Sequence, residues 1–232
     1  MRRSTFTGMR DIDIDILNKL DDKKLIEMCE MDQYLYSICN DQVFWQRRVI
    51  STYGKYLTLD EMKKGKGDRN WSDYYIEIYK LLKSKNPEYE AAKLLDDPAP
   101  DYAKREDLKA RRHDLFTLLT QIKKVDVKRV IDEFPGLSRI YYVSVHNGDY
   151  IKQGPYIMEQ PGEFVKGEYL NGKPIGRWVH DMPGSYSETT YYDNGVKKSY
   201  KHFEDGRGLI EREYYDKEGK PTKLHKWLKD YY

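Results

Sequence analysis

The chain has 232 residues, a mass of 27.7 kDa and a formal net charge of only +2. This length allows one or two domains. The small net charge excludes a global positive field of the kind that draws a protein to nucleic acid or to an anionic membrane. Charged residues make up 34% and hydrophobic residues 39%, so the composition is polar but still able to form a folded core, helped by an aromatic content of 14%.

The termini and the cysteines indicate the compartment. No apolar run reaches the roughly 18 residues that a membrane-spanning helix requires, and Met1-Arg2-Arg3 is not followed by the apolar segment of a signal peptide. Cys29 and Cys39 both fall in a region with helical spacing. We therefore predict two buried thiols in a reducing compartment rather than a disulfide framework, and a soluble intracellular protein.

Residues 1–50 predict a compact module of short helices. Apolar residues recur from Ile12 to Met28 at spacings that favour short helices over a strand, although aspartates alternate with them at first. The pair Asp21-Asp22 is suited to cap the helix that follows, and Asp41 to open the last helix. The expected core of this module consists of Leu25, Ile26, Cys29, Leu35, Ile38 and Cys39, with Phe44 and Trp45 packing back onto it.

The order of residues between Met9 and Val49 resembles an F-box-like domain. The matching residues are Ile16-Leu17, Leu20, Asp22 to Leu25, Cys29, Tyr34, Ile38-Cys39, Asp41 and Phe44-Trp45-Gln46-Arg47-Arg48. The module is most similar to those of giant DNA virus proteins, in which Ile-Cys-Asn-Asp precedes Phe-Trp. F-box domains bind the SKP1 adaptor of a ubiquitin ligase, so the resemblance implies a substrate receptor.

One departure from the F-box pattern concerns the adaptor contact. The Leu-Pro pair that opens an F-box would fall near Gly8-Met9 and is absent. We expect the adaptor-facing side chains to be the apolar ones nearby, namely Ile12, Ile14, Leu17 and Leu20. The alternative is a packed helical cap that binds no adaptor, in which the same side chains face the interior of the chain.

Residues 51–135 predict a helical middle region. Segment 51–67 looks irregular, and its run Lys63-Lys64-Gly65-Lys66-Gly67 is predicted to be a solvated basic loop, because its glycines match no phosphate-binding motif. Apolar spacing and capping residues then predict helices over 71–82, 87–95 and 101–124. A last short helix is predicted over 125–134, where Pro135-Gly136 ends it and marks a domain boundary.

The helix predicted over 101–124 carries seven Lys/Arg against four Asp/Glu. Its run from Lys109 to His113 is the strongest candidate for nucleic-acid contact in the chain. A solvated helix face explains the same residues, and we favour that interpretation.

Residues 136–232 repeat themselves. Four turn glycines recur at steps of 24, 23 and 24 residues, and each is preceded by Asn or Glu and by an aromatic, strand-like run: Gly148, Gly172, Gly195 and Gly219. A second glycine opens each unit, at Gly136, Gly162, Gly184 and Gly208. A regular period in the twenties indicates a stacked array rather than an enzyme pocket. Asn-Gly is typical of a tight turn with positive φ at both central positions, so each unit is predicted to be a β-hairpin.

The unit from Gly167 to Trp178 resembles the MORN repeat, with a tyrosine and Asn-Gly at one strand end and a glycine and a tryptophan on the return strand. The first and third units match less well. The resemblance implies a meandering single-layer sheet used for binding. The residues expected to bind or pack in this array are Tyr169, Gly172, Trp178, Tyr192, Gly195, Tyr215 and Trp227.

Sequence motifs for catalysis are missing. There is no Gly-x-Ser-x-Gly, no cysteine–histidine nucleophile and no phosphate cradle, and the five histidines lack partners at metal-ligand spacing. We therefore expect no enzyme, no cofactor and no metal site.

These observations predict an α+β fold: an F-box-like helical module over 1–50, a helical middle over 51–135 and an antiparallel meander of MORN-like hairpins over 136–232. The function expected first is a protein–protein interaction protein of the host cytoplasm, an F-box-type adaptor whose array chooses the substrate. The alternative is a minor capsid or virion-associated protein of a giant DNA virus, with neighbouring virion proteins as partners. Nucleic-acid binding is the third hypothesis.

Overall fold

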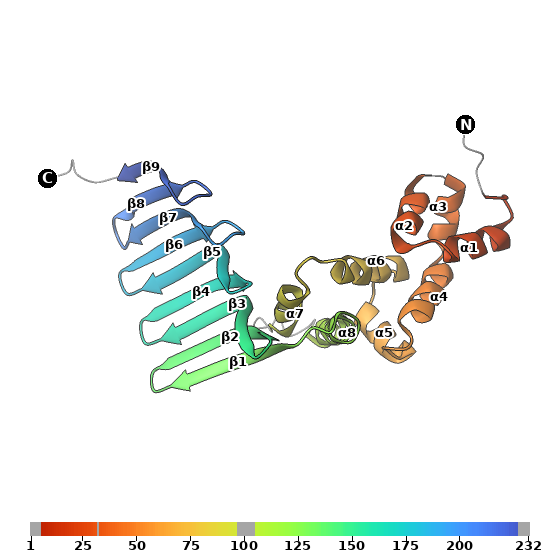
Figure 1. The fold of residues 1–232 in the computed structure, drawn as a ribbon, viewed down its shortest axis with the longest axis horizontal. Coiled ribbons are helices and arrows are strands. Elements are labelled where there is room, and N and C mark those ends of the chain that lie inside the picture. The colour runs from red at the N-terminus through yellow and green to blue at the C-terminus, as the bar shows by residue number, and fades with distance from the viewer. Residues whose placement is uncertain (1–5, 32, 97–104, 227–232) are drawn as a thin grey trace. The chain divides into compact units, whose positions relative to one another are not determined.

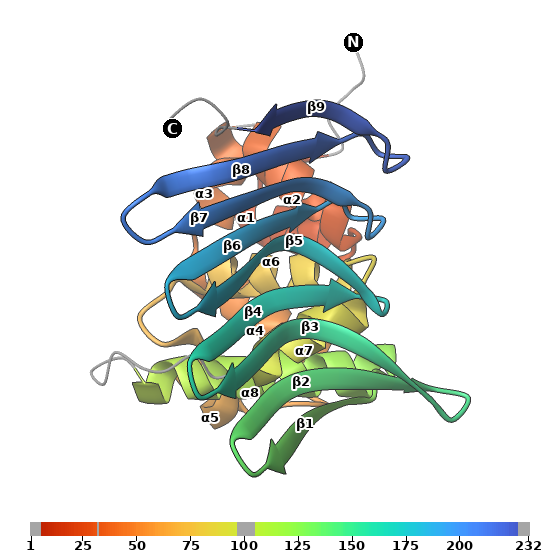
Figure 2. The ribbon, with the colours of Figure 1, turned by 90° about the vertical axis from the view of Figure 1, so that its left-hand side faces the viewer.

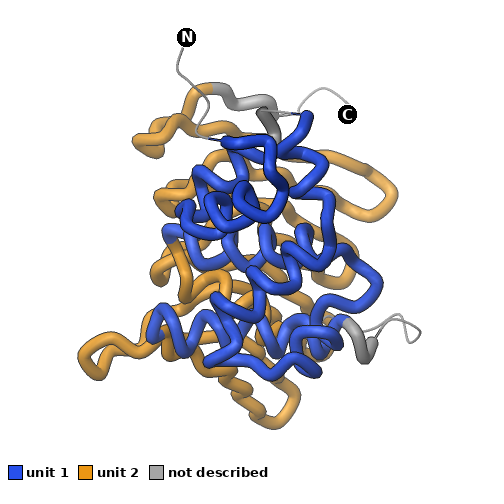
Figure 3. The backbone as a smooth tube through the Cα atoms, turned by 90° about the vertical axis from the view of Figure 1, so that its right-hand side faces the viewer, with its two compact units in different colours: residues 1–85, 99–124 blue, residues 86–98, 125–232 orange. Residues whose placement is uncertain are grey.

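The computed structural model describes residues 6–31, 33–96 and 105–226, and this part of the chain has an α+β fold (Figure 1). Helices precede an antiparallel sheet of nine strands in chain order, which confirms the predicted class. The chain divides into two compact units, one of residues 1–85 and 99–124 and one of residues 86–98 and 125–232 (Figure 3).

The first unit is helical. Its core is built from apolar and aromatic side chains that are almost fully buried, among them Leu17, Leu25, Ile38, Tyr74 and Leu118. Its helices in the described residues are α1 (Arg10–Asn18), α2 (Asp22–Met31), α3 (Gln33–Cys39), α4 (Gln42–Tyr53), α5 (Leu59–Lys66), α6 (Trp71–Leu82) and α8 (Arg105–Lys123).

Two predicted helix caps of this unit are confirmed. The Asp21 side chain accepts a hydrogen bond from the Lys24 backbone N–H at 3.0 Å, and the Asp41 side chain accepts one from Val43 at 2.8 Å. Each aspartate thus satisfies a backbone donor that has no partner within the first turn of its helix.

The basic segment predicted as an irregular loop is instead helix α5, so that prediction is wrong. A capping box starts the helix: Thr58 N–H donates to Glu61 Oε2 at 2.7 Å, and Glu61 N–H donates to Thr58 Oγ1 at 3.3 Å. Gly65 lies inside the helix because α5 packs closely on α8, where a Cβ at Gly65 would be 1.8 Å from Asp114 Oδ2. Tertiary packing therefore overrides the low helix propensity of glycine here.

The two cysteines are joined. Cys29 of α2 and Cys39 of α3 form a disulfide across a Cα–Cα distance of 5.7 Å, so the prediction of two free thiols is wrong. Both cysteines are buried, as expected. Helices α2 and α3 pack against each other and so bring the two side chains together, which helical spacing alone does not reveal.

The second unit consists of α7 (Pro87–Leu95) and the sheet, in which each strand pairs antiparallel with the next (Figure 2). The strands are β1 (Val127–Phe134), β2 (Leu137–His146), β3 (Asp149–Gln160), β4 (Glu163–Leu170), β5 (Lys173–Met182), β6 (Ser185–Tyr191), β7 (Lys197–Glu204), β8 (Gly208–Tyr215) and β9 (Pro221–Lys226).

The short helix predicted over 125–134 is wrong, because Val127–Phe134 form strand β1. This strand pairs with β2 along its whole length, from Val127 opposite Ser144 to Phe134 opposite Leu137. Pro135-Gly136 is the turn of this hairpin rather than the end of a helix. The sheet therefore begins before residue 136, where the repeat array was expected to start.

The turns of the array follow two patterns. Asn171 and Gly172 have φ values of 51° and 76°, which confirms the predicted tight turn, and Asn147-Gly148 is similar. At Asn194-Gly195 only the glycine has a positive φ, of 84°, so the prediction of two positive φ values fails there. Tyr192 N–H instead donates to Val196 O at 2.9 Å across a longer loop, which ends in the glycine.

Helix α7 covers one face of the sheet, which we call the helix face. Tyr142 donates from its hydroxyl to Asp96 Oδ1 at 3.1 Å, and the Tyr89 hydroxyl donates to Glu168. Ala92 packs so closely on the sheet that a Cβ at Gly154 would be 2.5 Å from its own Cβ. The opposite face carries no described helix of this unit, and we call it the open face (Figure 2).

Candidate interaction face of the sheet

Cross-strand register places a row of aromatic residues on the open face. Tyr142 points to α7, so its neighbour Tyr141 points to the open face, because successive side chains of a strand alternate. Tyr141 pairs with Tyr156, and Tyr156 pairs with Gly167. Paired residues of an antiparallel sheet share a face, so all three lie on the open face.

Five aromatic residues, Trp178 among them, form a chain of ring contacts on this face. The indole lies 5.0 Å from the Tyr169 ring and 5.5 Å from the Tyr156 ring. In a sheet with a single layer, such rings half-bury one another where a thicker domain would have a second layer. We call this group the tyrosine–tryptophan cluster; its members are Tyr141, Tyr156, Tyr169, Trp178 and Tyr191.

A lysine lies over three rings of the cluster. Lys152 Nζ is 5.2, 5.3 and 5.0 Å from the ring centroids of Tyr141, Tyr156 and Tyr169. Burial lowers the pKa of Lys152, and the charge of Arg139 lowers it further. Because Lys152 Nζ lies this close to three rings, the ammonium stabilises one end of the cluster through cation–π contacts.

The same arrangement recurs farther along the sheet. Lys197 Nζ is 4.5 Å from the Tyr215 ring and 5.4 Å from the Tyr200 ring, and it forms an ion pair with Glu213 at 3.4 Å. Burial lowers the pKa of Lys197, but hydrogen bonding to Tyr215 and Glu213 outweighs it and leaves the pKa raised. Both lysines thus contact tyrosine rings of the sheet, and Lys197 is also paired with a carboxylate.

A hollow of about 330 Å³ lies beside the cluster on β4 to β7. The Trp178 Nε1 and His202 Nδ1 atoms are buried and have no hydrogen-bond partner. His180 at the edge of the hollow lies 2.6 Å from a carboxylate oxygen of Glu163. The residues that line the hollow are Val165, Trp178, Val179, His180, Met182, Ser187, Thr189, Tyr191 and Tyr200.

The residues predicted from the repeat fall into three groups. Tyr169 and Trp178 lie in the cluster, and Gly172 and Gly195 lie in turns. Tyr192 links two units, because its hydroxyl donates to the Tyr215 carbonyl at 3.0 Å. Trp227 lies outside the described residues.

The sequence did not single out Tyr141, Tyr156, Tyr191 or Lys152. Side chains of a strand alternate between the two faces, so counting residues from each turn would in principle place these four on the face of Trp178. The count fails because β-bulges shift the register in the pairs β2–β3, β4–β5 and β6–β7. Only the paired strands show which tyrosines meet.

The four residues expected to face an adaptor do not share one environment. Leu17 is fully buried in the core, Ile14 and Leu20 are half-buried, and Ile12 is 46% exposed. Met9 and Val43 are also exposed, and an ion pair of 2.8 Å between Arg10 and Asp41 joins the starts of α1 and α4. We call Met9, Ile12 and Val43 the N-terminal apolar patch.

A buried carboxylate fixes the segment in front of α1. Asp13 accepts hydrogen bonds from the Thr7 N–H at 2.8 Å, the Gly8 N–H at 2.9 Å and the Tyr34 hydroxyl at 2.9 Å. Burial would raise the pKa of Asp13, but these hydrogen bonds outweigh it and hold the pKa below its usual value. This polar anchor lies directly in front of α1.

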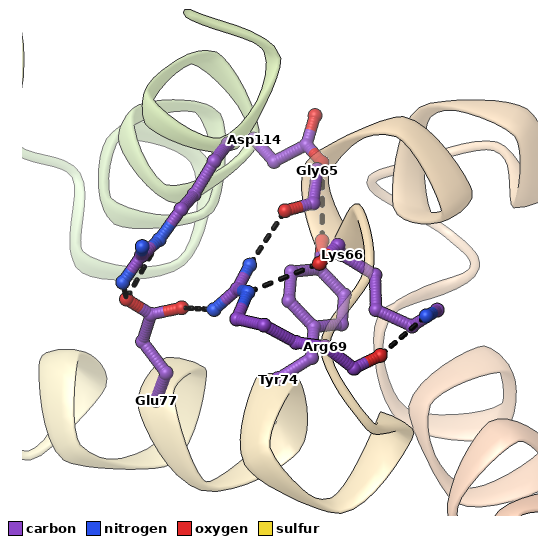
Figure 4. Close-up of polar contacts among 7 residues, drawn as sticks. Gly65, Lys66, Arg69, Tyr74, Glu77 and Asp114 are labelled. Atoms are coloured by element: carbon purple, nitrogen blue, oxygen red, sulfur yellow. Dashed lines mark hydrogen bonds and ion pairs between the residues drawn. The ribbon is translucent and has the colours of Figure 1, made fainter. Parts of the chain in front are cut away.

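The basic run on α8 is partly neutralised within its own unit. Arg111 Nε donates to Glu77 Oε1 at 3.0 Å. Arg69 pairs with the other carboxylate oxygen of Glu77 (Figure 4). Arg69 also donates to the carbonyl oxygens of Gly65 and Lys66 at 2.6 and 3.0 Å. Arg111 therefore serves to hold α8 against α6 rather than to present a free guanidinium.

Among residues 6–31, 33–96 and 105–226, no group of three or more His, Cys, Asp or Glu is arranged to hold a metal ion. Among the same residues, every helix is too short or too polar to cross a lipid bilayer.

Comparisons with known proteins give no family. No protein-family model and no curated protein matches the chain. A crystal structure of TarM matches 47% of this chain and 21% of its own, with 17% identity and a TM-score of 0.27. A mutant of S. aureus TarM in complex with fondaparinux, alpha-GlcNAc-glycerol and UDP matches 78% of this chain and 30% of its own, with 13% identity and a TM-score of 0.27. The chain spans less than a third of those proteins, and similarity this low carries no argument about fold or function.

Proposed function

We propose that this chain is a protein–protein interaction protein, an adaptor that holds one protein on the open face of its sheet and another on its N-terminal module. The observation that carries the proposal is the tyrosine–tryptophan cluster, which lies on the face opposite α7. Tyrosine and tryptophan supply rigid, amphipathic contact area, and both are enriched in protein interfaces.

The charges near the cluster favour a protein over a nucleic acid as the occupant of the open face. Lys152 and Lys197 lie over tyrosine rings, and Lys197 is paired with Glu213. Phosphate contacts need lysine or arginine side chains that are free to replace counterions. The hollow beside Trp178 is lined by both apolar and hydroxyl side chains, among them Val165, Ser187 and Thr189, which suits it to a protein segment.

The second partner in this proposal is a SKP1-type adaptor of a ubiquitin ligase. The N-terminal apolar patch supports it, because Ile12 lies on α1 close to the position of the missing Leu-Pro pair. With both partners bound, the chain would act as a substrate receptor.

The open face is tested with two tyrosines of the same strand. Tyr191 of β6 belongs to the cluster, whereas Tyr186 of β6 stacks on Phe203 on the helix face at 4.3 Å. We expect a tagged full-length chain to capture its partner, Tyr191→Ala to lose it, and Tyr186→Ala to keep it, with all three proteins equally folded by circular dichroism. Equal capture by the two variants would overturn the assignment of the open face.

SKP1 binding is tested at two apolar side chains of similar exposure. Ile12 is 46% exposed and Leu108 of α8 is 48% exposed. We expect purified SKP1 to bind the wild type and Leu108→Asp but not Ile12→Asp. If the folded wild type fails to bind SKP1, the proposed ubiquitin-ligase role is wrong. That result does not bear on the open face, which the Tyr191 and Tyr186 variants test separately.

A further inference from the structure

Strand β1 is an edge of the sheet and lacks the usual protection of edges. Among the residues that the structure describes, it pairs with β2 only, over eight residues from Val127 to Phe134, with no register shift and no proline. Natural edge strands are commonly shortened, bulged or interrupted by proline, because an open row of backbone N–H and C=O groups can pair with another chain. By contrast, bulges interrupt the pairing of β3 with β2 and of β5 with β4.

The exposed side chains of β1 combine apolar groups with a directional charge pattern. Ile131 is 48% exposed and Phe134 is 59% exposed. The basic residues Lys128 and Arg129 occupy the first half of the strand, and the acidic residues Asp132 and Glu133 occupy the second half. In an antiparallel pair of two such strands, the basic half of one strand lies opposite the acidic half of the other. A second copy of β1 is therefore complementary in charge.

Symmetry limits the registers in which two copies can pair. A two-fold axis that relates antiparallel edge strands stands perpendicular to the sheet, so each residue stays on its own face in both copies. A register centred on Ile131 places Ile131 of one copy opposite Ile131 of the other. It also places Arg129 of each copy opposite Glu133 of the other, which gives two symmetric ion pairs. All three residues alternate onto the helix face and are exposed there.

A register centred on Val130 would pair Lys128 with Asp132 on the open face. Asp132 already accepts a hydrogen bond from the Tyr141 hydroxyl at 3.1 Å. The register centred on Ile131 leaves the Tyr141 bond intact and buries the exposed Ile131 against its own copy, so it fits the surface better. Arg129 also contacts the Tyr142 hydroxyl, a neutral group that leaves its positive charge to pair with Glu133 of the other copy.

We propose that β1 pairs antiparallel with β1 of a second copy of this chain, in the register centred on Ile131, and joins two nine-stranded sheets into one. The contact is isologous and therefore closes as a dimer. It uses neither the open face nor the N-terminal apolar patch, so it stands apart from the adaptor function.

Sedimentation velocity of the full-length chain over a range of concentrations tests this proposal. We expect the wild type to have twice the mass of 27.7 kDa. Arg129→Glu places like charges opposite each other at two symmetric positions and is expected to weaken the dimer by about tenfold or more. The double variant Arg129→Glu/Glu133→Arg exchanges the pair and is expected to restore the dimer.

Lys128→Glu is the matched control, because it changes the same charge on the adjacent residue but on the other face of the strand. We expect it to leave the dimer unchanged. Circular dichroism checks that every variant is folded. A wild type that is monomeric at all concentrations, a dimer that Arg129→Glu leaves intact, or a double variant that fails to restore pairing would each overturn the proposal.

Discussion

Gly167 of β4 lies directly beneath the indole of Trp178 on β5, and a Cβ at this position would be 2.0 Å from Trp178 Cδ2. Gly167 has no positive φ, so the reason for glycine here is space rather than backbone conformation. The missing side chain lets the indole lie against the strand and reach Tyr156 and Tyr169 on either side. The packing of the tyrosine–tryptophan cluster thus depends on one absent methyl group.

Gly167→Ala is therefore expected to destabilise the sheet by about 1–3 kcal/mol, because the new methyl group must displace the indole. Urea unfolding followed by circular dichroism measures the loss. In a Trp178→Ala background the obstacle is gone, so we expect the second substitution to be almost neutral there. Equal costs of Gly167→Ala in both backgrounds would show that the two residues are not coupled.

Asp114 of α8 provides a pH-dependent test of the first unit. Burial raises the pKa of its carboxyl group to about 6, although it accepts a hydrogen bond from the Tyr74 hydroxyl at 3.1 Å. An unfolded aspartate has a pKa of about 4, so the folded chain binds this proton more tightly. The resulting stabilisation is fully present below pH 4 or so and is lost as the pH rises through about 6.

Asp114→Asn removes this titration while its amide oxygen can still accept the Tyr74 hydroxyl. We expect the variant to gain stability relative to the wild type between about pH 4 and pH 7, by up to about 2 kcal/mol. Asp68→Asn is the control, because it makes the same substitution at an exposed aspartate. Urea unfolding at several pH values measures the difference, and a constant difference across the range would contradict the prediction.

The disulfide between Cys29 and Cys39 closes a short loop between α2 and α3. Cross-linking removes conformational entropy from the unfolded chain, so Cys29→Ala/Cys39→Ala is expected to lower the free energy of unfolding by about 2–4 kcal/mol. A reducing agent should destabilise the wild type similarly and leave the double variant unchanged. Alkylation of both cysteines in the folded, unreduced wild type would show that the bond is not formed.

The basic run on α8 is expected to bind nucleic acid weakly at best at about 150 mM salt, because Arg111 is already paired with Glu77. Fluorescence anisotropy with labelled DNA and RNA over a salt series measures this. Tight binding that falls steeply with salt, and that an Arg111→Ala/Arg112→Ala variant loses, would instead favour the nucleic-acid hypothesis.

The sequence by itself determined the tight turns and the helix caps, because both depend on residues that are close together in the chain. Asn171-Gly172 sets positive φ at two successive positions without help from distant residues, so the hairpins could be read from the chain. Asp21 and Asp41 cap helices through backbone donors only two or three residues away. The order of helices followed by hairpins rests on such short-range interactions.

Tertiary structure decided the features that depend on residues far apart in the chain. Gly65 lies within α5 because Asp114, far along the chain, packs against it. Val127–Phe134 forms a strand because β2 offers it a partner, although its charge pattern also suits a helix. Cys29 and Cys39 meet only once α3 folds back on α2, and the tyrosines of the open face share a side only after bulges shift their register. Short-range turns and caps are encoded within a few residues, whereas a shared face, a close helix contact or a disulfide is set by the three-dimensional path that brings distant segments together.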